Sequence, residues 1–394
     1  MKYIKVVHTA DVHLGKRFPH MEREADTMRS EDLFRVFGDL VTHVIRNETD
    51  LLLVAGDLFD RANTRRETMS QVLEWFSKIH EALPGSRIGL TPGEDEVFVR
   101  KDGRWDCVLS VFDHLPYVDV LGGGPEPDRR IYELAGREIT VTSCPFELFF
   151  DPAFKAKNIP MARKGFGIFV LHAFSRRLGM RSMSDDEVRD RILDPLASRG
   201  YGYCALGHRH TTQAVEHDAI KAAWPGSLER LSFDEDRGRK SFISFTIDDT
   251  NKMSRLEAVR SAVRPLEHIT IPCTLGENRL DSILEDTLQR GGRDKVLHIA
   301  LEGQMEFELF NSFKKSEILS RLREKFAIVH IDNRLVLVSG REGYDYAALK
   351  VGTPAEEFKR YIEREISATR PGSDERALLV ELYKMGVKEL EQEP

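Results

Sequence analysis

Several features that would assign a chain quickly to a class of protein are missing from this sequence. It has only four cysteines, and they stand far apart without a Cys-x-x-Cys pair, at Cys107, Cys144, Cys204 and Cys273. This scarcity argues against a disulfide framework and against a cysteine zinc site. We therefore expect buried free thiols.

Long apolar runs are missing as well. No run approaches the ~18 residues that a membrane span needs. The start, MKYIKVVHTADVH, has neither the apolar core nor the small-residue cleavage site of a signal peptide. We therefore expect a cytoplasmic protein without a membrane segment.

The sequence also lacks an excess of positive charge. Its 394 residues include 58 basic and 65 acidic side chains, which gives a formal net charge of −7. A general nucleic-acid binder would be more basic, so any contact with DNA must be local. With 41% hydrophobic residues, the chain is long enough for two or three domains, each with a core of its own.

The first 250 residues alternate compact apolar runs with helical periodicity. The runs YIKVVH, DLLLVAGD and RIGLTPGE each end in polar residues, and helices are predicted between them over about 31–47 and 66–82. Further strands are predicted at 139–143, 167–172, 201–207 and 241–247. This order indicates a layered α/β domain whose strands are covered on both faces.

The composition changes after about residue 250, where the histidine clusters stop. We predict three parts: an α/β domain over 1–250, a small α+β domain over 265–350 and a helical tail over 353–394. Two amphipathic helices are expected in the tail, separated by Arg370-Pro371-Gly372. Their apolar stripes would pack on the chain's own body or on a partner.

Residue types that bind metals follow four of the predicted strands. They are Asp11-Val12-His13, Gly56-Asp57-Leu58-Phe59-Asp60, His172 and Gly207-His208-Arg209-His210. Any one of these has an ordinary structural explanation, such as a turn or a capped strand end. Together they offer mixed oxygen and nitrogen donors, which suit manganese, iron or zinc. Two ions roughly 3.5–4 Å apart could share one carboxylate and activate water for attack on phosphorus.

These segments resemble the motifs of the calcineurin-like metallophosphoesterases, whose pattern is DxH, GDxxD, GNH[D/E], a lone His and GHxH. HTADVHLG, DLLLVAGDLFD, ALGHRH and WPGSLERLSFDE (224–235) are similar to the SbcD-type nuclease subunits of bacterial double-strand-break repair complexes. The resemblance runs through nearly the whole chain. It implies a four-layered αββα core of two mixed sheets flanked by helices, with a smaller α+β capping domain and C-terminal helices.

The resemblance also implies two divalent metal ions, with manganese the expected metal. It assigns one ion to Asp11, His13, Asp57 and His210, and the other to Asp57, Glu94, His172 and His208. Asp57 would bridge the two ions. Asp60 would orient a histidine ligand, although a helix cap or turn explains this residue almost as well.

One loop departs from the family pattern. Where the family has Gly-Asn-His-Asp/Glu, this chain has Gly93-Glu94-Asp95-Glu96. Glu94 can still bind a cation through oxygen, but Asp95 replaces the catalytic histidine that assists phosphoryl transfer in the family. Nearby cations would keep its carboxyl group ionised, so it would be a poor general acid. We expect metal binding to persist and turnover to weaken, unless the loop is merely solvated and a neighbour such as His20 substitutes.

Local basic residues predict contacts with DNA, and the resemblance implies contacts with partners. Basic residues after His172 would meet DNA phosphates, namely Arg176, Arg177 and Arg181, although short arginine clusters are usually solvated surface. The tail would dock on an SbcC-type coiled-coil ATPase subunit through Phe358, Tyr361, Ile362, Leu378, Leu382 and Met385. The family generally forms homodimers through helices of its first domain.

The sequence therefore predicts a manganese-dependent DNA exonuclease and endonuclease. It would hydrolyse phosphodiester bonds during double-strand-break repair, together with its ATPase partner. Two alternatives stay open. One is a non-catalytic or weakly catalytic scaffold that holds metal and senses DNA ends for the ATPase, as the loop at 93–96 would allow. The other is a general phosphodiesterase of small molecules, against which the capping domain and the WPGSLER segment argue.

Overall fold

A computed structural model gives the fold of the chain. It describes residues 3–19, 21–100, 105–162, 165–172, 183–217, 220–233, 235, 239–276 and 280–338, with 358, 359, 361–363, 365, 366, 369, 376, 378–383 and 386 of the tail. Among these residues, no helix is both long enough and apolar enough to span a membrane.

Two six-stranded mixed sheets form the core. The first has the spatial order β14 (Met253–Arg260), β13 (Ser241–Ile247), β1 (Ile4–Thr9), β2 (Leu51–Ala55), β3 (Arg87–Thr91) and β6 (Val118–Val120). The second has the order β11 (Gln213–His217), β12 (Ile220–Trp224), β10 (Tyr201–Gly207), β9 (Phe166–His172), β8 (Arg137–Ser143) and β7 (Asp128–Leu134). β1, β2 and β3 are parallel to one another, as are β8, β9 and β10.

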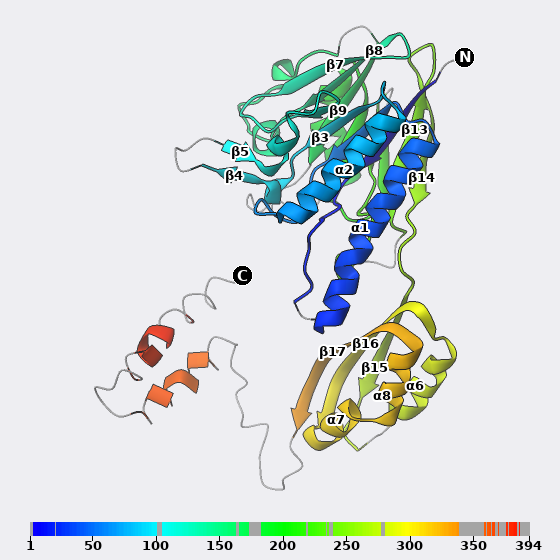
Figure 1. Ribbon diagram of the computed structural model, residues 1–394. Helices are drawn as coiled ribbons and strands as arrows, with labels where there is room; N and C mark the ends of the chain where they lie inside the picture. Colours follow the sequence, from blue (N-terminus) through cyan, green and yellow to red (C-terminus); the bar gives the residue numbers. More distant parts are fainter. Residues whose placement is uncertain are drawn as a thin grey trace. The chain divides into compact units, whose positions relative to one another are not determined.

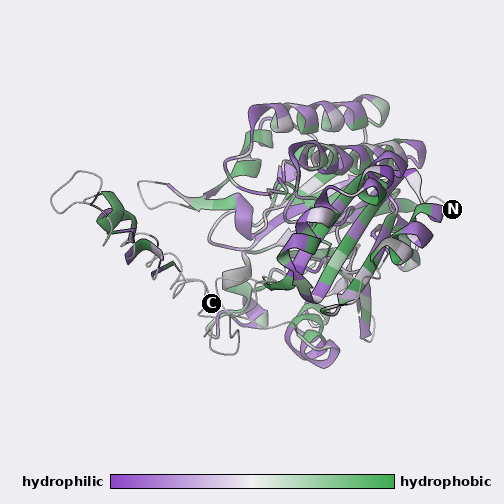
Figure 2. Cartoon of the chain, turned by 90° about the horizontal axis from the view of Figure 1, so that it is seen from below, coloured by the Kyte–Doolittle hydropathy of each residue, from purple (hydrophilic) through white to green (hydrophobic). Residues whose placement is uncertain are grey.

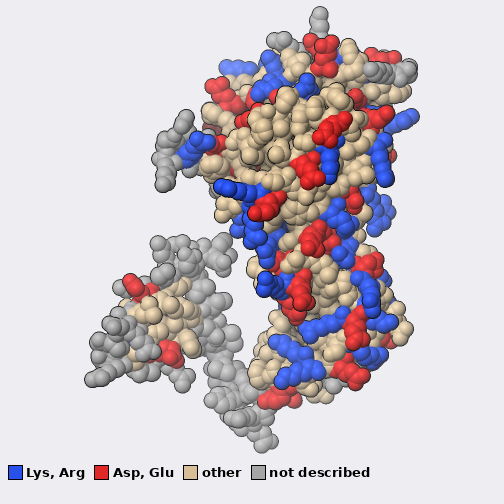
Figure 3. Space-filling view, viewed as in Figure 1, with Lys and Arg blue, Asp and Glu red and all other residues tan. Residues whose placement is uncertain are grey.

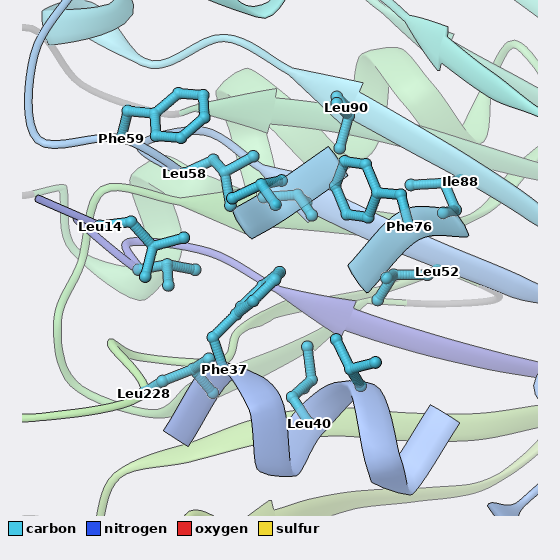
Figure 4. Close-up of a cluster of buried hydrophobic side chains, with 14 of the residues drawn as sticks. Leu14, Phe37, Leu40, Leu52, Leu58, Phe59, Phe76, Ile88, Leu90 and Leu228 are labelled. Atoms are coloured by element: carbon cyan, nitrogen blue, oxygen red, sulfur yellow. The ribbon is translucent and has the colours of Figure 1, made fainter. Parts of the chain in front are cut away.

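Alternation along the strands separates the core into layers. On β2, Leu51 and Leu53 belong to a buried cluster that includes Ile168 and Val170 of β9, so this cluster lies between the two sheets. Leu52 and Val54 point the other way, into a cluster with the helices α1 (Arg23–Arg46) and α2 (Arg66–Ala82). Figure 4 shows this second cluster, and Figure 1 shows α1 and α2 beside the strands.

A third cluster covers the outer face of the second sheet. Side chains of β9, β10 and β12 pack there on a helical segment made of α4 (Asp185–Val188), a short π-helix (Arg189–Leu193) and α5 (Asp194–Ala197). Helices therefore flank a pair of sheets, and the prediction of an α/β fold with mixed sheets is confirmed. Helices of the core combine hydrophobic and hydrophilic residues along their length, as Figure 2 shows.

Helix α1 begins about eight residues before the predicted helix, and polar side chains explain the difference. Asp26 is buried, and its carboxylate accepts hydrogen bonds from Phe18 N at 2.7 Å and Arg17 Nε at 2.8 Å. Arg29 is also buried and donates to Asp32 Oδ2 at 2.9 Å. Apolar periodicity cannot reveal a helical turn whose buried face is charged.

A smaller α+β part follows the core. Its three-stranded sheet has the order β15 (Leu266–Cys273), β16 (Gly292–Glu306) and β17 (Phe326–Val338), and its helices are α6 (Leu280–Gln289), α7 (Phe307–Lys314) and α8 (Glu317–Lys325). The contacts divide the chain into two units: Met1–Pro272 with Asn278–Glu302 and Glu317–Arg334, and Cys273–Glu277 with Gly303–Ser316 and Leu335–Pro394. The boundaries 1–250, 265–350 and 353–394 stay a prediction.

Several short elements complete the described fold. They are the ribbon β4 (Val97–Val99) and β5 (Trp105–Cys107), the helix α3 (Phe146–Phe149), and 3-10 turns at Glu94–Glu96, Val108–Phe112 and Ala156–Asn158. None of the four cysteines forms a disulfide. Three of them are buried as expected, whereas Cys273 is half-buried.

Candidate metal centre

The predicted metal ligands follow the carboxyl ends of strands from both sheets. Asp11 and His13 come after β1, Asp57 follows β2, His172 closes β9, and the Gly207-His208-Arg209-His210 segment closes and follows β10. Parallel strands end at one edge of a sheet, where their loops can meet. The two sheets face each other, so loops from both reach one place.

Backbone hydrogen bonds tie the first two loops together. Asp11 N donates to Gly56 O at 3.0 Å, and Val12 N and His13 N both donate to Asp57 O at 2.9 Å. From the second sheet, His208 N donates to the carboxylate of Asp11, Oδ1, at 3.0 Å. Backbone donors and acceptors therefore join the first two loops, and the Asp11 carboxylate joins them to the loop of the second sheet.

Four of the predicted ligands have left-handed backbone conformations. Their φ angles are 51° at Asp11, 50° at His13, 52° at Asp57 and 80° at His208. Such a conformation costs a non-glycine residue on the order of 1–3 kcal/mol and concentrates at functional sites. The local strain is one reason to regard these positions as functional.

Two glycines allow the close packing around Asp57. Gly56 has φ of 90°, and a Cβ there would lie 2.0 Å from His172 Nδ1. A Cβ on Gly93 would lie 1.9 Å from Asp57 Oδ1. Any side chain at either position would displace a predicted ligand.

The structure brings five predicted ligands into two compact groups. Asp11, His13 and His210 form one, and Asp11, Asp57 and His172 form the other, with the candidate donor atoms of each group within 4.8 Å of one another. Asp11 is thus common to both groups. Asp57 Oδ2 lies 3.5 Å from His13 Nε2 and 3.4 Å from His172 Nε2, between a histidine of each predicted set.

Glu94 and His208 fall outside both groups, but they border the same space. A cavity of about 310 Å³ is lined by His13, Asp57, Glu94, Asp95, His208 and His210. The rings of His172 and His208 meet edge to face, with centroids 5.3 Å apart. Asp95 is exposed at this cavity, and burial together with the Asp57 charge raises the pKa of its carboxyl group.

Three imidazoles of the centre have an oxygen atom near Nδ1, two of them buried and that of His210 half-buried. His172 Nδ1 lies 3.0 Å from Ala55 O, His210 Nδ1 lies 2.7 Å from Glu235 Oε1, and His13 Nδ1 lies 3.4 Å from Asp60 Oδ1. The Nε2 atoms are thereby left to face the centre. Fixing one ring nitrogen in this way is how proteins usually orient histidine ligands of metals.

The donor atoms at the centre fit a cation. Within the described part of the chain, Asp11 Oδ2, Asp57 Oδ1, His13 Nε2 and His172 Nε2 are buried without a hydrogen-bond partner. Buried polar atoms almost always have partners, so a convergent set without them calls for an ion. The residues present are therefore suited to divalent metal.

Electrostatics point in the same direction. Burial alone would lower the pKa of His172, but the Asp57 carboxylate raises it to about 10. Burial also raises the pKa of Asp57, yet the neighbouring histidines hold it below its usual range. Asp60 behaves similarly, because the contact with His13 and the charge of Lys16 outweigh burial and hold its pKa at about 2. The centre thus favours positive charge beside its carboxylates.

Two supporting acids carry no separate prediction from the sequence. Glu96 completes the 93–96 motif, and its buried carboxylate accepts hydrogen bonds from Asp57 N at 3.0 Å, Phe59 N at 2.8 Å and Gly93 N at 2.8 Å. Glu235 ends the quoted segment 224–235 and contacts His210. The sequence showed an acid at each of these motif positions, but it could not show which residue the acid contacts.

Replacing Glu96 with glutamine is expected to lower the free energy of unfolding by about 2 kcal/mol or more. The amide nitrogen would face backbone donors that the carboxylate now accepts, and the charge that strengthens these bonds would be lost. Burial and the Asp57 charge raise the pKa of Glu96 to about 7, which offsets part of the effect. Urea unfolding at pH 8 measures it, with exposed Glu133→Gln as control. Equal stability of the two variants would contradict this role.

Other predicted residues belong to the second compact unit or are not among the described residues. Arg176, Arg177, Arg181, His20 and Met385 are not among the described residues. In the tail, Ile362 is buried and Phe358 half-buried, whereas Tyr361 and Leu378 are 63% and 62% exposed and Leu382 is also exposed. The role of these residues stays a prediction.

The chain belongs to the calcineurin-like phosphoesterase family, whose model matches residues 4–212. This match covers every predicted ligand and the part of the core from β1 to β10, whereas β11 to β14 follow it in the chain. The family uses divalent metals, in agreement with the donor groups at the centre.

Particular relatives extend the similarity beyond the core. The DNA double-strand break repair protein Mre11 of Saccharolobus solfataricus is 22% identical over 318 residues, which cover 76% of this chain and 76% of that protein. The protein of the same name from Methanopyrus kandleri is 26% identical over 306 residues, 75% of this chain and 64% of that protein. YhaO of Bacillus subtilis, an uncharacterized metallophosphoesterase, is 22% identical over 338 residues, 82% of this chain and 78% of that protein.

Proposed function

We propose that this protein is a metal-dependent DNA nuclease related to Mre11 and SbcD, which hydrolyses phosphodiester bonds during double-strand-break repair. The observation that carries the proposal is the set of buried, unpartnered donor atoms of Asp11, Asp57, His13 and His172 among the described residues. The names of the two archaeal relatives supply the substrate class. Action on chromosomal DNA would take place in the cytoplasm.

The proposed ligand sets are those implied by the sequence. Asp11, His13, Asp57 and His210 would hold one ion, and Asp57, Glu94, His172 and His208 the other. When bound, two divalent ions such as manganese supply a polarised phosphoryl group and an activated water. Asp11, Asp57 and Glu94 would offset three of the four positive charges, and the strained loops would keep the imidazoles aimed inward.

DNA would be recognised locally. Figure 3 shows basic and acidic residues interspersed on the face in view, without a continuous basic surface. Phosphate contacts would come from a few arginines, with Arg176, Arg177 and Arg181 the candidates from the sequence, and binding would weaken with salt.

The test is cleavage of linear and hairpin DNA with manganese, comparing the natural protein with His210→Ala. We expect cleavage by the natural protein that requires added metal and falls by about 10²-fold or more in the variant, as when one group that stabilises transition-state charge is removed. A panel of nucleotide and aryl phosphates runs beside it. Turnover of these esters without cleavage of DNA would replace the proposal with a small-molecule phosphodiesterase.

A non-catalytic scaffold for DNA ends is the second candidate, and Glu94 and Asp95 favour it. Both line the cavity, where they add negative charge against a phosphodiester anion. This candidate requires DNA binding without cleavage under any divalent ion. The same cleavage assay, combined with a binding assay, separates the two functions.

We further propose that residues 353–394 bind an SbcC-type coiled-coil ATPase and that the protein works as a homodimer. Exposed apolar side chains at Tyr361, Leu378 and Leu382 support a contact of the helix-in-groove kind. Deleting residues 353–394 is expected to leave manganese binding intact and to abolish capture of the ATPase in a pull-down. Retained capture would refute this assignment.

A further inference from the structure

One histidine of the candidate centre is held by an acid outside the ligand set. Glu235 Oε1 lies 2.7 Å from His210 Nδ1, while His210 Nε2 lies 3.9 Å from Asp11 Oδ1 on the other side of the ring. The ring is therefore fixed between a carboxylate behind it and the centre in front. His172 has a neutral carbonyl in the corresponding place.

A buried lysine holds the Glu235 carboxylate. Lys240 Nζ donates to Glu235 Oε2 at 2.5 Å, to Ser227 Oγ at 2.8 Å and to His210 O at 3.0 Å, and its side chain is only 2% exposed. One ammonium group thus binds both the acid and the backbone of the histidine that the acid contacts. The cost of burying a lysine is offset here by three acceptors, one of which, the Glu235 carboxylate, also forms an ion pair.

Glu235 forms hydrogen bonds with residues of the segment directly before it. Leu231 N donates to Glu235 Oε2 at 3.1 Å, and Glu235 N donates to Ser232 Oγ at 3.2 Å. Leu231 is buried in the cluster beneath α1 and α2. These contacts limit the rotation of the Glu235 side chain relative to the core.

Phe233, in the same segment, stacks on two histidines of the small sheet. Its ring centroid is 4.4 Å from that of His298 on β16 and 4.9 Å from that of His330 on β17, with interplanar angles of 12° and 18°. All three residues belong to the first compact unit. The segment that presents Glu235 is therefore also attached to β16 and β17.

We propose that Glu235 is a positioning residue for His210, and that Lys240 and Phe233 fix Glu235 in place. The inference rests on the proposed metal centre and adds a selective role to it. A carboxylate on Nδ1 sets the tautomer and orientation of the ring and makes Nε2 a stronger donor. His210 belongs to the group with Asp11 and His13 but not to the group with Asp57 and His172, so Glu235 acts on one ion position only.

The experiment is a manganese titration of the full chain, followed by the electron paramagnetic resonance signal of free Mn²⁺. We expect two binding steps in the natural protein. In Glu235→Ala, one step weakens by about 10–100-fold, as when the hydrogen-bond partner of a metal-binding histidine is removed, while the other stays unchanged. A purely structural role would weaken both steps together or neither.

Three further variants sharpen the result. Glu235→Gln keeps an acceptor for His210 and should lose less affinity than Glu235→Ala at the same step. Phe233→Ala and Lys240→Met should weaken that step too, because each loosens Glu235. Glu133→Ala, an exposed acid on β7, is the matched control and should bind both ions normally.

Two unchanged affinities in a folded Glu235→Ala protein would overturn the proposal, and so would equal weakening of both steps. Where the alanine variant does not fold, the isosteric Glu235→Gln decides by the same criterion. Unchanged affinity in Phe233→Ala would remove the attachment to the small sheet from the proposal. The titration needs no DNA, so absence of nuclease activity leaves it valid, whereas absence of both steps in the natural protein would overturn the metal centre itself.

Discussion

Replacing Asp57 with asparagine is expected to lower manganese-dependent DNA cleavage by about 10³-fold or more, because the change affects both proposed ion positions at once. The Asp57 carboxylate lies within 3.5 Å of His13 and of His172. An amide has nearly the same shape but no charge, and only one of its two terminal atoms can bind a cation. Initial rates on linear duplex DNA at several manganese concentrations measure the loss.

The melting temperature separates a lost metal from a lost fold. An ion that binds only the folded state raises its stability, by about 2.7 kcal/mol at 100 times the dissociation constant. Manganese should therefore raise the melting temperature of the natural protein and of Asp249→Asn, an exposed control after β13, but not that of Asp57→Asn. Normal cleavage by a folded Asp57→Asn protein would contradict the proposed site.

Combining Glu94→Asn with Asp95→His is expected to raise manganese-dependent cleavage by about 10²-fold or more, since a positioned general acid contributes roughly 10²–10⁴ in rate. Both residues line the cavity beside His13 and His210. The substitutions remove two negative charges near the phosphodiester and add an imidazole that can protonate the leaving oxygen. The carboxyl group of Asp95 donates poorly, because bound cations would lower its pKa.

A matched variant distinguishes charge from proton transfer. Glu94→Asn combined with Asp95→Asn removes the same charges without adding an imidazole, and should give a much smaller gain. With the imidazole present, the rate should decline at high pH as the ring loses the proton that it donates. If the variant with Asp95→His cleaves no faster than the natural protein, the 93–96 loop is not what limits turnover.

The sequence was most informative where a single local pattern of apolar residues predicts a single strand or helix. Strands β1, β2 and β9 were visible as apolar runs, and α2 spans Arg66–Ala82 as its periodicity predicted. Each of these elements buries one or both of its faces, and the spacing of its apolar residues shows which faces are buried. The ligand types at the strand ends were equally visible, and five of the seven lie in the two compact groups.

The sequence was less informative where polar side chains are buried. The first turns of α1 contain Asp26, Arg29 and Asp32. Each of them has at least one partner outside the helix, so no local pattern shows that they are buried. Glu96 and Glu235 were similarly inconspicuous as ordinary acids of a loop. A hydrogen bond to a distant backbone or imidazole leaves no periodic trace in the chain.

The residues alone determined the α/β class, the order of strands and helices, and the kind of donors offered to a metal, because propensity and alternation are local properties. Tertiary structure alone decided which donors meet. His210 and Asp11 are nearly two hundred residues apart, and only the packing of two sheets brings their atoms within 3.9 Å. The same packing attached Glu235 to His210 and Glu96 to the Asp57 loop, since contacts between distant segments depend on the whole fold.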